Sequence, residues 1–271
     1  MNYKGKWALV TGASAGIGAA FARALAAKGA NVALTARRPD RLADLASEIE
    51  REFGVKTLVV PADLADPAGP SRIADALKAK TVEIDILINN AGYGLPGTFV
   101  ENQWKDHRAF IDCLVASHVE LAHRFLPAMQ KKRWGRIVNV ASVAGLVPGS
   151  AGHTLYGAAK AFIVSFSQSL AAENENNGVH VSALCPGFTY SEFHDANGTR
   201  ALVSQMPKFM FMNAEPVVES GLAAVERAHV VFVPGAWNKL VAGLMKALPR
   251  PWGAALVKSQ SKNFRRSNPT S

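Results

Sequence analysis

Cysteine is scarce in this chain of 271 residues: only Cys113 and Cys185 are present, far apart and each in an apolar stretch. Neither has the spacing of a metal ligand or of a disulfide framework, so we expect buried free thiols, no metal site and a reducing compartment. The chain also lacks a run of roughly eighteen apolar residues, and its first residues show no signal-peptide pattern. We therefore expect a cytoplasmic protein.

Acidic residues are absent after Glu226, whereas eight Lys and Arg residues follow it. The whole chain has 30 basic and 21 acidic side chains, so most of the excess positive charge lies in this last part. That distribution argues against a nucleic-acid-binding protein. Apolar residues lie between the charges, a pattern typical of a basic amphipathic segment. It predicts either peripheral contact with an anionic membrane or a solvated helix that packs on its own domain or on a second subunit.

Apolar segments of strand length alternate with longer amphipathic segments. The expected strands are residues 7–10, 31–35, 56–61, 84–89, 135–140, 179–185 and 230–233, and the expected helices include 19–28, 41–53, 103–129 and 155–174. Continuous apolar strands separated by helices are typical of a parallel sheet covered on both faces. We expect one doubly wound α/β domain with about seven strands over residues 1–236, followed by a basic helical extension over residues 237–271.

A glycine-rich turn, residues 11–18, directly follows the first expected strand and precedes the first expected helix. A dinucleotide pyrophosphate binds at this place in such folds, where backbone N–H groups and the positive end of a helix face the ligand. Gly12, Gly16 and Gly18 would allow a tight turn and close approach of the phosphates. Their spacing differs from the usual dinucleotide fingerprint, so a simple tight loop is the alternative.

The end of the second expected strand bears on the choice of dinucleotide. An acidic side chain usually binds the free ribose hydroxyls of NAD there, but this chain has Arg37 and Arg38. Cationic side chains favour a 2′-phosphate, so NADP(H) is favoured over NAD(H). The alternative is that one or both arginines point into solvent. Asp63, after the third strand, is placed either to contact the adenine amino group or to act only as a turn residue.

Tyr156 and Lys160 are four residues apart in an expected helix, so they lie on the same helical face. A nearby ammonium favours the phenolate, which would make Tyr156 a usable proton donor or acceptor near neutral pH. The spacing alone is common in helices, and a purely structural pair is the alternative. Ser142, which follows the fifth expected strand, is the third candidate catalytic residue.

Together these motifs resemble those of the short-chain dehydrogenase/reductase (SDR) family over about residues 5–235. The resemblance rests on the turn 11–18, Asp63-Leu64, the run 89–92, Ser142, the Tyr156 and Lys160 pair, and Pro186-Gly187. Further segments, 95–97, 125–129, 186–193 and 233–235, are similar to those of a bacterial reductase branch of broad specificity.

The resemblance implies a Rossmann-type fold and an NADPH-dependent oxidoreductase that transfers hydride between the nicotinamide and a carbonyl or secondary alcohol. In such an enzyme Tyr156 would be the general acid or base, Lys160 would lower its pKa and hold the nicotinamide ribose, and Ser142 would orient the substrate oxygen. The cofactor-binding residues implied are Gly12, Ser14, Gly16, Ile17, Gly18, Arg37, Arg38, Asp63, Leu64, Asn90, Ala91, Gly92, Tyr156, Lys160, Pro186, Gly187, Thr189 and Ser191.

Two features depart from the family pattern. Ser142 and Tyr156 are fourteen residues apart rather than the more usual thirteen, so we expect one extra residue in the loop between them. Leu114 occupies the position where many relatives have a catalytic Asn, and Ser117 or His118 could in principle replace it. Leu114 therefore leaves a second hypothesis open, a catalytically impaired NADP-binding regulatory protein. Sugar-nucleotide epimerisation is disfavoured because no nucleotide-sugar domain is evident.

The sequence leaves alternatives open for the substrate and for the oligomeric state. Residues 203–212 are rich in Met and Phe and predict either an apolar lid, which would favour an apolar carbonyl substrate, or a packed helix or dimer contact. The resemblance implies a homodimer or homotetramer built through helices 103–129 and 155–174.

Overall fold

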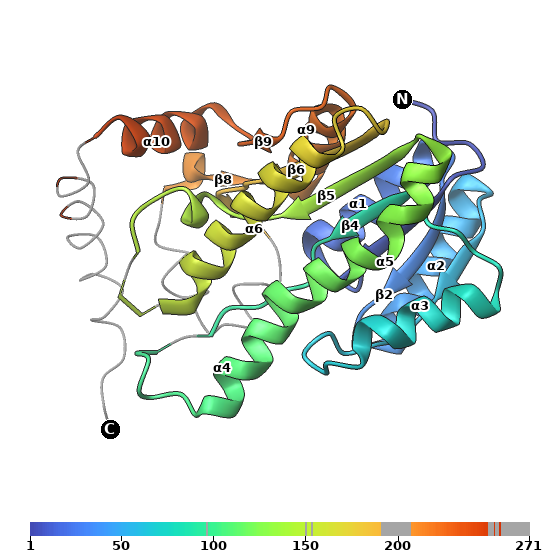
Figure 1. The fold of residues 1–271 in the computed structure, drawn as a ribbon, viewed down its shortest axis with the longest axis horizontal. Helices are drawn as coiled ribbons and strands as arrows, with labels where there is room; N and C mark the ends of the chain where they lie inside the picture. The colour runs from blue at the N-terminus through green and yellow to red at the C-terminus, as the bar shows by residue number, and fades with distance from the viewer. Residues whose placement is uncertain are drawn as a thin grey trace.

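The fold of the chain is a single parallel sheet with helices on both faces (Figure 1). The computed structural model describes residues 1–95, 97–149, 151–152, 154–190, 207–248, 252 and 255. Within them the main sheet has seven strands in the order β3-β2-β1-β4-β5-β6-β9, and all six strand pairs are parallel. This order confirms the doubly wound α/β architecture expected from the sequence.

The strands lie close to the positions that the apolar segments predict. Their bounds are β1 (Trp7–Thr11), β2 (Asn31–Thr35), β3 (Thr57–Val59), β4 (Ile86–Asn89), β5 (Gly135–Val140), β6 (Val179–Leu184) and β9 (Val231–Phe232). A second, two-stranded sheet pairs β7 (Phe188–Thr189) with β8 (Phe211–Met212). It was not expected, because strands of two residues leave no periodic pattern in the sequence.

The helices connect successive strands and cover the sheet. Their bounds are α1 (Gly16–Ala27), α2 (Pro39–Phe53), α3 (Gly69–Ala79), α4 (Trp104–Ile111), α5 (Ser117–Lys132), α6 (Thr154–Glu173), α9 (Ala214–Glu226) and α10 (Ala236–Ala247), with short 3-10 turns at Val143–Gly145 and Lys208–Met210. The single helix expected over 103–129 is divided by a π-helix, η1 (Asp112–Ala116), into α4 and α5.

Alternating residues of the central strands build two separate core layers. On β1, Ala8 and Val10 pack with Phe21 of α1 and with α9, whereas Leu9 packs on the opposite face with Leu121 of α5. Successive side chains of a strand point to opposite faces, so a buried strand must be apolar at every position. This requirement explains why continuous apolar runs in the sequence predicted the strands.

The strand order changes side between β1 and β4, so a topological switch point lies between these two neighbouring strands. The strands β2 and β3 lie on one side of β1, and β4, β5, β6 and β9 follow on the other. In open parallel sheets this switch point leaves a crevice at the carboxyl ends of the strands, where ligands bind. The candidate site residues of this chain follow those strand ends.

The C-terminal part is described only in its first portion. Helix α10 begins where the basic extension was expected to begin, and Leu240 and Leu244 on it are 62% and 52% exposed. The greater part of the segment after residue 248 lies outside the described residues, and with it the predicted membrane contact. Among the helices in the described part, none has the length and apolarity needed to cross a bilayer.

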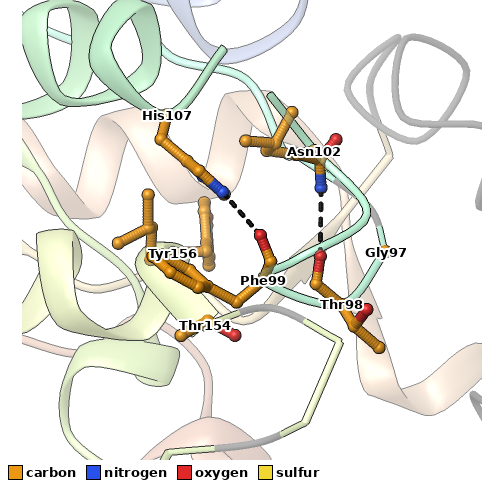
Figure 2. Close-up of a pocket in the computed structure, with 9 residues that line it drawn as sticks. Gly97, Thr98, Phe99, Asn102, His107, Thr154 and Tyr156 are labelled. Carbon is orange, nitrogen blue, oxygen red and sulfur yellow. Dashed lines mark hydrogen bonds between the residues drawn. The ribbon is translucent and has the colours of Figure 1, made fainter. Parts of the chain in front are cut away.

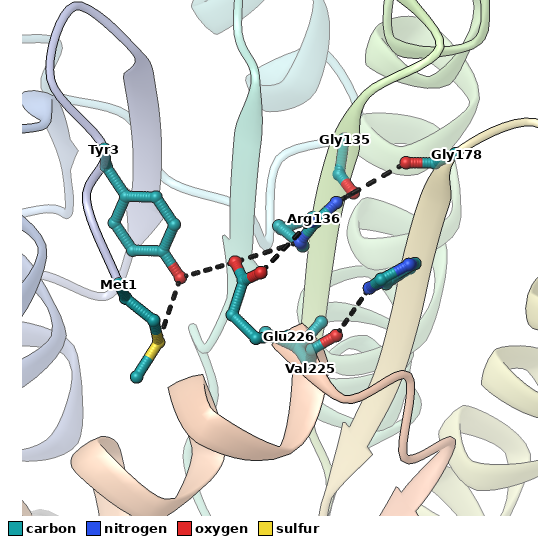
Figure 3. Close-up of polar contacts among 8 residues, drawn as sticks. Met1, Tyr3, Gly135, Arg136, Gly178, Val225 and Glu226 are labelled. Atoms are coloured by element: carbon teal, nitrogen blue, oxygen red, sulfur yellow. Dashed lines mark hydrogen bonds and ion pairs between the residues drawn. The ribbon is translucent and has the colours of Figure 1, made fainter.

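A partly buried ion pair between Arg136 and Glu226 connects the N-terminus, β5 and α9 (Figure 3). Arg136 donates from Nε to Glu226 Oε1 at 2.9 Å and from Nη2 to Glu226 Oε2 at 3.1 Å, and the Tyr3 hydroxyl donates to Glu226 Oε1 at 2.8 Å. Burial raises the pKa of Glu226, but the hydrogen bonds from Arg136 and Tyr3 outweigh it, and the net pKa is lowered. The carboxylate therefore stabilises the fold in its ionised form.

We expect Glu226→Gln to lower the free energy of unfolding by about 2–3 kcal/mol at neutral pH, because Arg136 would keep a buried charge without its partner. A carboxyl group whose pKa is depressed by folding stabilises the protein above its unfolded-state pKa, and this contribution is lost as the pH falls through the folded pKa. The difference between parent and variant, measured by urea unfolding, should therefore shrink on acidification. Glu219→Gln is the control: its ion pair with Lys28 is half exposed, so the cost should stay below about 1 kcal/mol. Equal costs for the two variants would contradict this account.

Candidate active site

The predicted site residues gather at one edge of the sheet. The glycine-rich turn follows β1, Arg37 and Arg38 follow β2, Asp63 follows β3, Asn90 follows β4, Ser142 follows β5, and Pro186 follows β6. The carboxyl ends of parallel strands meet at the same edge, so segments far apart in the sequence become neighbours.

The glycine-rich turn is held by the loop after β4. Asn90 Nδ2 donates to the Thr11 carbonyl at 2.8 Å and lies 3.4 Å from the Gly12 carbonyl, while the Thr11 hydroxyl accepts from the backbone N–H groups of Asn90 and Ala91. Gly12 has φ 66°, and a Cβ at Gly18 would lie 2.2 Å from the Gly12 carbonyl oxygen. Glycine is therefore required at positions 12 and 18 of this turn, and a simple flexible loop would not need such close packing.

The start of α1 next to this turn is suited to an anion. No side chain caps the first turn of α1 by a hydrogen bond, and the first turn contains no acidic residue. The orphan N–H groups and the positive end of the helix dipole therefore face the crevice. The residues present fit a pyrophosphate, which would lie against the backbone of the turn that contains Ser14 and Ile17.

Of the two arginines after β2, Arg38 contacts this turn. Arg38 donates from Nε and Nη2 to the Ser14 hydroxyl at 3.3 and 3.0 Å, which places its guanidinium against the glycine-rich turn. Arg37 is exposed. Burial raises the pKa values of Tyr93 and Cys113 to about 12, and the positive charge of Arg37 opposes this rise in part.

Asp63 and Leu64 are placed less directly for a ligand. Asp63 Oδ1 accepts from the Ala65 N–H at 2.9 Å, the hydrogen bond of a turn residue. The side chain of Leu64 is 5% exposed and belongs to the core, so only its backbone can face the crevice.

Ser142, Tyr156 and Lys160 come together despite the extra loop residue. The hydroxyls of Ser142 and Tyr156 are hydrogen-bonded, and Lys160 Nζ lies 5.8 Å from the centroid of the Tyr156 ring. Lys160 is 4% exposed and donates to the Val140 carbonyl, at the end of β5, at 2.7 Å. Helix α6 thus presents both residues to the same end of β5.

The electrostatics of this trio differ from the expectation. Burial raises the pKa of Tyr156 to about 12, and the hydrogen bond with Ser142 only partly opposes it. Burial lowers the pKa of Lys160 to about 8. The expected lowering of the Tyr156 pKa by Lys160 is not found, because the ammonium is directed at the Val140 carbonyl and desolvation dominates at both groups.

The segment after β6 lies against α10. The Pro186 carbonyl accepts from the Val143 N–H at 3.0 Å, and the Thr189 hydroxyl donates to the Gly187 carbonyl at 3.3 Å. A Cβ at Gly187 would lie 2.2 Å from Asn238 Oδ1, so this glycine is required for the contact with α10. The contact with Asn238 was not predicted, because no local pattern links Asn238 to Gly187. The remaining predicted residue of this segment, at position 191, lies outside the described residues.

A pocket beside Tyr156 was also not foreseen (Figure 2). Its lining residues are Leu95, Gly97, Thr98, Phe99, Asn102, His107, Thr154, Leu155 and Tyr156. His107 stacks on the Phe99 ring, with centroids 4.5 Å apart, and its Nε2 lies 2.8 Å from the Phe99 carbonyl oxygen. These contacts join a loop to the start of α4, and the irregular loop carries no periodic signal from which they could be read.

Leu114 lies in the middle of the π-helix η1 and is fully buried. A Cβ at Gly92 would lie 3.4 Å from Leu114 Cγ, so the leucine side chain packs against the loop that follows β4. π-Helices occur mostly as short interruptions of α-helices and often at functional sites. The neighbouring candidates Ser117 and His118 are also buried, at 2% and 1% exposure.

Known proteins are similar to this chain in sequence and in fold. The family model described as short chain dehydrogenase matches residues 6–201. The 3-oxoacyl-[acyl-carrier-protein] reductase FabG of Escherichia coli K12 is 34% identical over 235 residues, which cover 85% of this chain and 94% of that protein.

Two solved structures are similar over nearly their whole length. A short-chain dehydrogenase from Sphingobium yanoikuyae in complex with NADPH has a TM-score of 0.78 and 32% identity, covering 90% of this chain and 96% of that one. A 7beta-hydroxysteroid dehydrogenase has a TM-score of 0.85 and 26% identity, covering 95% and 99%. The chain therefore belongs to the short-chain dehydrogenase family and is an oxidoreductase that acts on CH–OH or C=O groups.

Proposed function

We propose that the protein is an NADPH-dependent reductase in which Tyr156 is the general acid. The observation that carries this proposal is the meeting of the Ser142 and Tyr156 hydroxyls with the buried Lys160 at the carboxyl end of β5. When bound, NADPH supplies the hydride. The chain contributes an acid, a second hydroxyl to orient the carbonyl oxygen, and a positive charge to stabilise the phenolate that remains.

The protonation states at neutral pH suit the reductive direction. With a pKa of about 12, Tyr156 keeps its proton and can donate it to a carbonyl oxygen. With a pKa of about 8, Lys160 is mostly charged below that pH. The reverse reaction, oxidation of an alcohol, needs the phenolate and should require a more alkaline medium.

NADP(H) is the proposed cofactor because the end of β2 carries Arg37 and Arg38. The contact of Arg38 with Ser14 places a cation next to the turn that would hold the pyrophosphate. Ser14 and Arg41 also line one pocket at the start of α2, together with Arg23, Asp44 and Glu48, so a further cation lies nearby although acidic side chains accompany it. A 2′-phosphate would be stabilised there by charge-assisted hydrogen bonds.

The substrate proposed is a carbonyl compound with an apolar body. Leu95, Phe99 and Leu155 line the pocket beside Tyr156. Near the segment after β6, Phe211 stacks on the Tyr190 ring and makes a tilted contact with the Phe188 ring. Residues 203–206 of the proposed lid lie outside the described residues. The relatives support a carbonyl substrate without deciding its identity.

The proposed assembly is a homodimer or homotetramer through α4, α5 and α6. Trp104 of α4 and Phe162 of α6 are 67% and 46% exposed, and Phe162 stacks on Phe166. Exposed aromatic residues on neighbouring helices are typical of subunit interfaces.

Analytical ultracentrifugation should show an oligomer for the parent and a smaller species for Phe162→Glu, because the charge would be placed in the proposed interface. A monomeric parent would refute the proposal.

We expect Tyr156→Phe to reduce turnover at least about 100-fold, because the acid is removed while its ring is kept. NADPH oxidation would be followed against a panel of apolar and polar ketones, with NADPH affinity measured separately by fluorescence. Tyr3→Phe is the control, since it removes a phenol hydroxyl on the N-terminal side of the sheet. Full turnover by Tyr156→Phe would refute the mechanism. NADPH binding without turnover by the parent on any ketone would favour the impaired cofactor-binding protein that Leu114 suggests.

Arg38→Ala should weaken NADPH binding by about tenfold or more and leave NADH binding nearly unchanged, because a charge-assisted hydrogen bond contributes about 1.5–3 kcal/mol. Arg37→Ala should act in the same direction. Arg51→Ala, at the far end of α2, controls for loss of positive charge on the same helix. Equal affinities of the parent for NADPH and NADH would show that the cofactor preference is wrong.

A further inference from the structure

Helix α10 buries a polar side chain and exposes apolar ones, the reverse of an ordinary surface helix. Within this helix, all of which the structure describes, Asn238 alone is buried, whereas Leu240 and Leu244 are exposed. A buried amide is costly unless its polar atoms are satisfied by specific contacts. Asn238 Nδ2 donates to the Pro234 carbonyl at 2.9 Å and lies 3.6 Å from Met212 Sδ. These contacts fix the orientation of the Asn238 amide.

The same amide lies against Gly187, in the segment after β6. The three heavy atoms nearest to a Cβ placed on Gly187 are Oδ1, Cγ and Nδ2 of Asn238, at 2.2, 2.6 and 2.8 Å. The φ angle of Gly187 is outside the left-handed region, so its backbone would accept another residue. The asparagine side chain, rather than the backbone conformation, therefore requires glycine at position 187. The two residues form one packed unit although they are far apart in sequence.

Gly187 is next to the residue that contacts the proposed catalytic hydroxyl. The Ser142 hydroxyl lies 3.5 Å from the Pro186 carbonyl, and the Val143 N–H donates to that carbonyl at 3.0 Å. Ser142 is in turn hydrogen-bonded to Tyr156. A shift of Gly187 would move Pro186 with it and would disturb the surroundings of Ser142.

Helix α10 also supports the two-stranded sheet β7-β8, which lies beside it (Figure 1). A Cβ on Gly235, the residue before α10, would lie 2.7 Å from Met212 Sδ in β8. The Trp237 ring meets the Phe209 ring edge-on, with centroids 5.2 Å apart. Because β8 pairs with β7, which belongs to the segment 186–189, these contacts reach the same segment by a second route.

The segment 186–189 lies where the proposed reaction needs the hydride donor. The pyrophosphate would lie at the glycine-rich turn after β1, whereas Ser142 follows β5 and Tyr156 lies on α6. In the proposed reductase the substrate oxygen contacts these two hydroxyls, and reaction requires the reacting atoms to be about 3–3.5 Å apart. The end of the cofactor that carries the hydride must then lie beside Ser142, and so beside this segment.

We propose that Asn238 is a positioning residue of the active site, which through Gly187 holds the segment 186–189 against Ser142 and so fixes where the nicotinamide binds. Asn238 acts through the backbone of the segment, and the helix that carries it is part of the cofactor site rather than only the start of a basic extension. The inference rests on the proposed NADPH-dependent function, because the nicotinamide is the group that the segment orients.

The first test compares the parent with Asn238→Ala in binding two ligands, NADP+ and adenosine 2′,5′-bisphosphate, which lacks the nicotinamide half. We expect the variant to bind NADP+ about tenfold more weakly and the bisphosphate within about twofold of the parent, measured by isothermal titration calorimetry. A merely structural loss of folded protein would reduce the binding of both ligands alike. Lys246→Ala, in the exposed last turn of α10, is the control and should bind both as the parent does.

Equal weakening of both ligands by Asn238→Ala, or no weakening of either, would overturn the inference. If this variant does not fold, Asn238→Ser also removes the amide and should show the same difference between the ligands. A parent that binds NADP+ but reduces no ketone would refute the proposed reductase and leave the comparison of ligands to decide the role of Asn238. A parent that binds neither ligand would overturn both proposals.

The second test uses the steric contact itself. Gly187→Ala should lower kcat for ketone reduction about tenfold or more, because the methyl group would meet Asn238 and displace the segment. Adding Asn238→Ala removes the three atoms that the methyl group would meet, so the double variant should turn over faster than Gly187→Ala. Each single change should lower kcat, and their combination should therefore be strongly non-additive. A double variant whose loss is the product of the two single losses would overturn the inference.

Discussion

The hydrogen bond between Lys160 and the Val140 carbonyl is the contact on which the site depends. It joins the middle of α6 to the end of β5 and buries a cation inside the fold. Burial of an ammonium costs several kcal/mol unless its hydrogen bonds are satisfied, so the surroundings of Lys160 must be polar and well ordered. The side chains of Asn89 on β4, Asn139 on β5 and Ser167 on α6 form an ordered network, because each amide donates through Nδ2 to an acceptor that fixes its orientation.

The sheet accounts for the position of this cation. Each strand of the crevice contributes its first residues after the carboxyl end, and the parallel register brings them to one edge. Thr11, the last residue of β1, and Asn90, the first residue after β4, show how tightly these ends are joined. The Asn90 backbone N–H donates to the Thr11 hydroxyl, and Asn90 Nδ2 donates to the Thr11 carbonyl. The core layers above and below make the strands rigid, so the polar groups at their ends keep their separations.

Much of this could be predicted from the sequence, and the exceptions share a cause. The strands and the doubly wound order followed from continuous apolar runs, and the grouping of Ser142, Tyr156 and Lys160 followed from motif order. The π-helix η1 could not be read, because an i→i+5 turn changes the helical phase without changing composition. The contact of Asn238 with Gly187 and the pocket at His107 depend on packing between distant segments, which no local pattern encodes. Among the described residues, the buried atoms Asn89 Oδ1 and His118 Nε2 have no hydrogen-bond partner, which likewise depends on packing between distant segments.

Burial affects Tyr156 and Lys160 together, although the lysine does not lower the pKa of the tyrosine in this structure. Desolvation moves both groups toward their neutral forms, raising the pKa of Tyr156 to about 12 and lowering that of Lys160 to about 8. Between about pH 8 and pH 12, both Tyr156 and Lys160 are therefore mostly neutral. In the proposed reaction Tyr156 gives up its proton, and the phenolate and the ammonium would then attract each other strongly, because the surrounding medium has a low dielectric constant. The burial that makes the phenolate costly in isolation therefore also makes the ammonium most effective after proton transfer. A lysine that stayed charged would stabilise the phenolate product of proton transfer, which neither group could do while exposed to solvent.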